Sequence, residues 1–83
     1  MKVYYVDGTR LVLEKTSEGF VVLGGRPRRV LVSITQEKVD KLRPSGLIGI
    51  AWRYGLNTPI GKAYRLLANV LRQNPDGTWT IYS

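Results

Sequence analysis

Cysteine and histidine are both absent from this chain of 83 residues. Without cysteine there can be no disulfide framework and no thiolate chemistry, and without either residue the usual zinc sites cannot be built. We therefore predict no metal site and no cofactor. No feature of the sequence indicates a small-molecule ligand.

Acidic residues are scarce, six against thirteen lysines and arginines. Asp7 and Asp76 belong to predicted turns, Glu18 to a predicted loop, and Glu37 and Asp40 to one exposed helix face, so no pair of carboxylates is placed for general acid and base catalysis. The common nucleophile and base arrangements need histidine or cysteine. We predict that the protein is not an enzyme.

Long apolar runs are also missing. No stretch approaches the ~20 residues needed to span a bilayer, and the residues after Met1 do not begin a signal peptide. We expect a cytoplasmic protein without a membrane partner, associated with the nucleoid if the source is prokaryotic or viral.

The composition indicates one folded domain. Hydrophobic residues make up 43% of the chain and charged residues 23%, which is typical of globular proteins. We predict an α+β fold in a single domain over residues 1–83, with an N-terminal antiparallel β-meander (1–34), a helical part (35–73), and a turn with a closing strand (74–83).

The meander is predicted from its turns and its strand-forming residues. Residues 2–6 and 9–14 are rich in Val, Leu and Tyr and flank Asp7-Gly8, a dipeptide that favours the positive φ angles of a tight hairpin turn. Residues 20–23 add a third strand. Residues 30–33 are expected to add a fourth.

Three helices are predicted after the meander. The first begins at Thr35, whose side chain can cap free amides, and stops at Arg43 because Pro44 restricts it. The second covers residues 47–54. The third starts at Thr58-Pro59, and its apolar period runs to Leu71, which favours helix over a hairpin strand for residues 70–73.

The third predicted helix separates apolar from cationic residues. At about 100° per residue, one side carries an apolar stripe and the other carries three cations and no acid. The polar side consists of Thr58, Lys62, Arg65, Asn69 and Arg72. Such a side is suited to meeting an anion, and the alternative is an ordinary solvated helix face.

The two helices around residues 55–58 resemble a helix-turn-helix. Ala51 is the small residue where the helices would cross, Gly55 follows it by four in the turn, and Ile50, Tyr54 and Leu56 occupy packing positions. Residues 63–67 are similar to the second helix of several winged-helix regulators. The likeness covers residues 46–82 and implies a DNA-binding transcriptional regulator with a helix in the major groove. One departure is Gly61, which stands where the family usually has an apolar residue.

Charge is unevenly distributed along the chain, whose net charge is +7. Residues 41–75 contain no acid and six cations, and residues 19–36 contain no acid and three arginines, Arg26, Arg28 and Arg29. Gly25-Arg26-Pro27 resembles the core of an AT-hook, which lies along the minor groove. The alternative is a basic turn that touches phosphates only.

These observations favour a small basic protein that binds DNA with full or partial sequence specificity, a transcriptional regulator in which the helix from Thr58 lies in the major groove. The predicted contact residues are Asn57, Thr58, Lys62, Arg65 and Asn69 near the bases, and Arg26, Arg28, Arg29, Arg53 and Arg72 along the backbone. A homodimer is expected, through Trp79 and Tyr82 or through Trp52.

Two other partners remain open at this point. A protein-interaction module, such as an adaptor or an inhibitor of a nucleic-acid enzyme, would use the same basic face on an acidic protein. RNA binding would use exposed aromatic residues on the sheet, with Tyr4, Tyr5, Phe20 or Trp79 stacking on unpaired bases.

Overall fold

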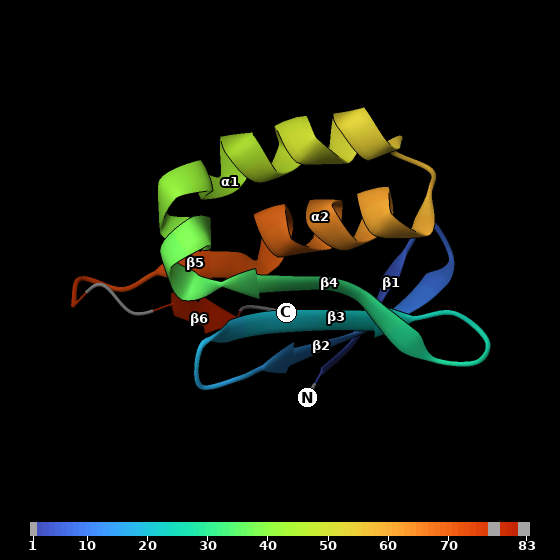
Figure 1. The fold of residues 1–83 in the computed structure, drawn as a ribbon, viewed down its shortest axis with the longest axis horizontal. Helices are drawn as coiled ribbons and strands as arrows, with labels where there is room; N and C mark the ends of the chain where they lie inside the picture. The colour runs from blue at the N-terminus through green and yellow to red at the C-terminus, as the bar shows by residue number, and fades with distance from the viewer. Residues whose placement is uncertain (1, 77–78, 82–83) are drawn as a thin grey trace.

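A computed structural model describes residues 2–76 and 79–81 and confirms the N-terminal antiparallel meander (Figure 1). Its four strands are paired in chain order: β1 (Lys2–Val6), β2 (Thr9–Lys15), β3 (Gly19–Gly24) and β4 (Arg29–Thr35). Asp7 and Gly8 both have positive φ, as a type I′ turn requires. The turn signal in the sequence is therefore correct.

One face of the sheet forms the core with the helices. Side chains alternate along β2, so Leu11 and Leu13 are fully buried in the core while Arg10 lies on the opposite, outer face. Tyr5 pairs with Arg10 across the β1–β2 ladder and so shares that outer face. Phe20, Val22, Val32 and Ile34 complete the inner face from β3 and β4.

The prediction of three helices is wrong, because the first two form one element, α1 (Gln36–Tyr54). Thr35 caps it as expected, accepting a hydrogen bond from the Lys38 amide at 3.1 Å. Arg43 alone leaves the helical region, with φ 60° and ψ 172°, and the chain turns sharply there (Figure 1). Pro44 restricts only the residue before it, so the helix resumes at once and no loop separates the two halves.

The second helix, α2 (Pro59–Val70), lies between α1 and the sheet (Figure 1). Ala63, Leu66 and Leu67 are among its buried residues, which reach both neighbouring layers. Gly61, in the first turn of α2, lies directly against Gly55, the residue that follows α1, since a Cβ on Gly61 would lie 1.9 Å from the Gly55 carbonyl oxygen. The family departure noted at Gly61 thus has a steric reason in this fold.

The structure contains the predicted C-terminal strand, but the helical prediction for residues 70–73 is wrong after Val70. Helix α2 ends at Val70, and the chain continues as β5 (Leu71–Gln73), which pairs with β6 (Trp79–Ile81) in a separate two-stranded sheet. The closing strand therefore pairs with β5, outside the four-stranded N-terminal sheet. Leu71 has the spacing of the apolar stripe of α2, but it is also buried as the first residue of β5. Apolar periodicity alone therefore placed the end of the helix too late.

Candidate nucleic-acid interface

Three connecting segments meet at one end of the molecule. The antiparallel order of the sheet places the turn at residues 7–8 beside the loop at residues 25–28. Hydrogen bonds from Arg65 to Asp7 and to the Leu56 carbonyl bring the α1–α2 turn, residues 55–58, to the same end. These segments and the strand and helix ends beside them are called the basic end, which lies at the right of Figure 1.

Charge is concentrated at the basic end. Seven of the thirteen lysines and arginines lie there, and Asp7 is the one carboxylate among the described residues of this end. The seven are Arg10, Arg26, Arg28, Arg29, Arg53, Lys62 and Arg65. The other five acidic residues lie near the far end of β2, in the β2–β3 turn, on the first half of α1 and in the turn after β5. The fold therefore concentrates a positive potential at one end.

Two of the predicted contact residues hold the basic end together. Lys62 donates from Nζ to the Thr9 hydroxyl at 2.7 Å, and Arg65 donates to the Asp7 carboxylate at 2.7 Å. Arg65 also donates to the Leu56 carbonyl at 3.1 Å. These side chains connect α2 to the β1–β2 hairpin, so their first role is structural.

The contact with Arg65 changes the pKa of the Asp7 carboxyl. Its pKa is lowered, first by the hydrogen bond from Arg65 and then by the charge of Arg65, with a smaller contribution from Lys62. A depressed pKa stabilises the fold only while the carboxyl is ionised. The contribution of the Asp7–Arg65 ion pair to stability is therefore fully present above the pKa that Asp7 has in the unfolded chain. It is lost as the pH falls through the lower pKa that Asp7 has in the folded protein.

Replacing Arg65 with methionine is expected to raise the pKa of Asp7 towards the ordinary value for aspartate. The methionine keeps an unbranched apolar stem but removes both the donor and the charge. An NMR titration of the Asp7 carboxyl carbon measures the shift. Lys41→Met is the control, because Lys41 pairs with Glu37 at 3.5 Å on α1, away from Asp7. An unchanged Asp7 titration in Arg65→Met would contradict the contact.

Eight of the ten predicted contact residues lie at the basic end, and two do not. Asn57 and Thr58 are exposed in the α1–α2 turn, and Arg53 is exposed in the last turn of α1. Arg26, Arg28 and Arg29 are exposed in or beside the β3–β4 loop, and Lys62 and Arg65 are half-buried. Asn69 and Arg72 lie near the opposite end of α2, where Arg72 donates to the Leu71 carbonyl at 2.8 Å.

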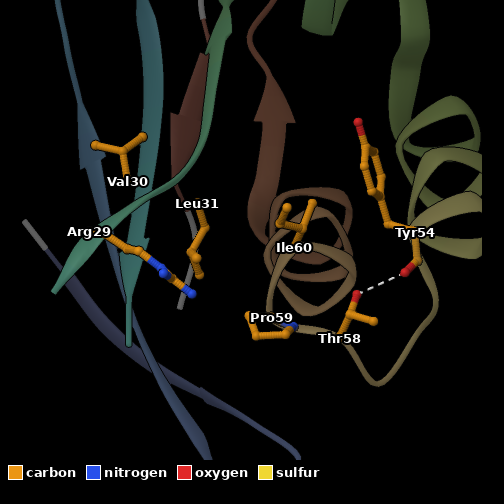
Figure 2. Close-up of a pocket in the computed structure, with 7 residues that line it drawn as sticks. All are labelled: Arg29, Val30, Leu31, Tyr54, Thr58, Pro59 and Ile60. Atoms are coloured by element: carbon orange, nitrogen blue, oxygen red, sulfur yellow. Dashed lines mark hydrogen bonds between the residues drawn. The ribbon is translucent and has the colours of Figure 1, made fainter. Parts of the chain in front are cut away.

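The Thr58 hydroxyl is already engaged by the protein backbone. It accepts from the Gly61 amide at 3.0 Å as the cap of α2 and lies 2.7 Å from the Gly55 carbonyl. Its bond to the Tyr54 carbonyl is drawn in Figure 2. A hydroxyl has one proton to donate, so the side chain has little capacity left for a base edge.

The geometry of α2 is not that of a helix free to enter a groove. The second half of α1 and α2 run side by side in opposite directions (Figure 1), as in a helical hairpin. The helices of a helix-turn-helix meet at about 90–120°. Within α2, all of which the structure describes, only Pro59 and Asn69 are exposed.

An apolar groove of about 340 Å³ opens between β4 and the start of α2 (Figure 2). Leu31 from β4 and Ile60 from α2 line it, with Arg29 on one wall and Tyr54 on the other. Tyr54 stacks on Tyr64 with ring centroids 5.8 Å apart. Burial, and then the neighbouring Tyr54, raise the pKa of the Tyr64 phenol.

Two residues that sequence reasoning left out of the DNA surface belong to the basic end. Arg10 is not among the ten predicted DNA contacts, and Tyr5 is predicted to stack only on RNA bases. Together with Arg26 and Arg28 they line a concavity of about 430 Å³ on the outer face of the sheet. Strand alternation was the available signal, because it places Tyr5 and Arg10 opposite each other and away from the buried Leu11.

The remaining predictions concern dimer contacts, metals and membranes. Of the expected dimer contacts, Trp52 is 68% exposed, while the Trp79 side chain and Tyr82 lie outside the described residues. Residues 2–76 and 79–81 contain no group of His, Cys, Asp and Glu that could hold a metal. In that same part of the chain, no helix is long and apolar enough to cross a membrane.

No family model, curated protein or solved structure matches this chain. No family match therefore supports the resemblance to a helix-turn-helix. It is a hypothesis based only on the spacing of the residues between 46 and 82.

Proposed function

We propose that this protein binds DNA through the basic end, by contacts to the phosphate backbone. The observation that carries the proposal is the concentration of seven cations beside one carboxylate, which is itself paired with Arg65. Five arginines of this end are exposed and have no ion-pair partner among the described residues: Arg10, Arg26, Arg28, Arg29 and Arg53. Such a cluster neutralises phosphates and releases their counterions.

The contact surface in this proposal differs from a helix in the major groove. Helix α2 is covered by α1 and by the sheet, and its two basic side chains are engaged by Thr9 and Asp7. The β3–β4 loop, by contrast, is exposed throughout residues 25–28 and carries Arg26 and Arg28. It closes tightly between the paired residues Gly24 and Arg29, so it would meet phosphates as a turn rather than lie extended along a groove.

The compartment in which we propose that the protein binds DNA is the cytoplasm.

Replacing Arg28 with glutamate is expected to weaken binding to a random-sequence duplex by about tenfold at low salt and to reduce the slope of log K against log salt by about 1. Lost phosphate contacts should act on every sequence alike. Fluorescence anisotropy of a labelled duplex of about 20 base pairs, at about 50 and 200 mM salt, measures both quantities.

Lys38→Glu is the matched control, because it makes the same change in net charge on an exposed residue of α1 beside Glu37 and Asp40. It should alter the affinity much less than Arg28→Glu does. Equal losses in the two variants would mean that only the overall charge matters. Salt-independent binding would contradict the proposal outright.

A second candidate function is binding of an acidic protein segment, and the groove of Figure 2 favours it. Leu31 and Ile60 offer apolar contact beside the Arg29 guanidinium. This lining fits an apolar side chain flanked by carboxylates. A short peptide of aspartate and glutamate around one leucine, with NMR shifts confined to Leu31 and Ile60 and weak binding to duplex DNA, would favour this function over the first.

A further inference from the structure

The concavity on the outer face of the sheet combines three kinds of surface in one place. Its floor is apolar: Leu23 is half-buried, and Val12, its partner across β2 and β3, is only 2% exposed. Tyr5 lines it with an aromatic ring that is 69% exposed. Its remaining wall is cationic, formed by Arg10, Arg26 and Arg28.

Tyr5 is not held by the core of the protein. Its neighbours in the sequence, Tyr4 and Val6, pack against the core cluster from the inner face, whereas Tyr5 points to the outer face. Two of the other aromatic residues predicted for base stacking differ from Tyr5, since Phe20 is 1% exposed and Tyr4 is half-buried, while the Trp79 side chain lies outside the described residues. An exposed ring beside an apolar floor is a surface on which a flat ligand can stack.

The charge of the concavity specifies an anionic ligand. No carboxylate lines it, and none of its three arginines has an ion-pair partner among the residues that the structure describes. Arginine offers five N–H donors in a planar fork that matches phosphate oxygens. The combination suits a flat aromatic group carrying a phosphate on each side.

We propose that this concavity binds an unpaired base of single-stranded DNA, stacked on Tyr5, with the flanking phosphates held by Arg10, Arg26 and Arg28. The inference rests on the proposed function and deepens it, since it specifies which form of DNA is bound. A base inside a duplex is stacked on both faces and cannot lie on a side chain. The protein therefore prefers single strands, or duplexes with unpaired bases, to intact duplex.

Tyr5→Ser is expected to weaken binding to a labelled twelve-nucleotide oligothymidylate by about tenfold, because base stacking on an aromatic ring is lost. Tyr5→Phe should bind like the native protein, since it keeps the ring. Val3→Ser is the matched control: Val3 is an exposed residue on the same strand and face, but it does not line the concavity. Fluorescence anisotropy gives the affinities, and the Tyr5 ring protons should shift upfield in NMR spectra.

The outcomes separate this inference from the proposed function. If Tyr5→Ser binds the oligonucleotide like the native protein while Arg28→Glu loses duplex binding, the stacking site is overturned and the backbone contact stands. If neither single-stranded nor duplex DNA binds, both proposals fail. Thymidine monophosphate binding as tightly as the oligonucleotide would overturn the strand assignment in favour of a free nucleotide. Tighter binding of oligouridylate would overturn it in favour of RNA.

Discussion

Gly61→Ala is expected to lower the free energy of unfolding by about 3 kcal/mol, at the upper end of the cost of overpacking. The added Cβ would lie 1.9 Å from the Gly55 carbonyl oxygen and 2.8 Å from its carbon. Both are backbone atoms, so no side-chain rotation can relieve the clash. The α1–α2 turn would have to open, which would weaken the contact from Arg65 to the Leu56 carbonyl as well.

Urea denaturation followed by circular dichroism measures this loss, and Gly49→Ala provides a control of opposite sign. Gly49 lies in the second half of α1, and a Cβ there meets nothing within 4 Å. Alanine loses less backbone entropy than glycine in a helix, so this variant should be more stable by about 0.5–1 kcal/mol. A Gly61→Ala protein as stable as the native one would show that the turn is not this tight.

Phe20→Ala is expected to cost about 3–5 kcal/mol of stability, as for other buried aromatic residues. Phe20 is 1% exposed, pairs with Ile34 across β3 and β4, and belongs to the core between the sheet and the helices. The loss combines the transfer of the ring to water with the cavity left behind. For a domain of this size it is a large share of the total stability.

Thermal and urea unfolding both report this change. Val3→Ala serves as the control, because Val3 is 46% exposed on the outer face, and its loss should stay within about 0.5 kcal/mol. Phe20→Leu should fall between the two. If Phe20→Ala lost as little stability as Val3→Ala, the Phe20 side chain would not be part of the packed core.

The sequence predicted those parts of the fold that depend on local signals. Asp7-Gly8 has the positive φ angles of its turn, and Thr35 and Thr58 both cap the helices they were expected to begin. The two errors in the helix boundaries occur where the local sequence is compatible with two structures. Pro44 bends the chain at Arg43 without ending the element, and Leu71 satisfies burial as well in β5 as in a helix.

The candidate site was harder to predict because it depends on contacts between distant parts of the chain. Lys62 and Arg65 have the spacing of a free cationic face, but their partners Thr9 and Asp7 lie 53 and 58 positions earlier. Nothing in the sequence near α2 reveals those partners. Tyr5 and Arg10, in contrast, could have been placed on one face from the alternation of the first two strands.

The contacts of Lys62 and Arg65 also have a consequence during synthesis. Arg10, Arg26 and Arg28 are made early, but the side chains that fasten the first hairpin to the rest of the molecule come from α2. A growing chain that has not yet reached Arg65 already carries the arginines of this surface. It lacks the hydrogen bond from Arg65 to Asp7 that holds the first hairpin against α2. The shape of this surface is thus completed only after about three quarters of the chain, 65 of 83 residues, has been made.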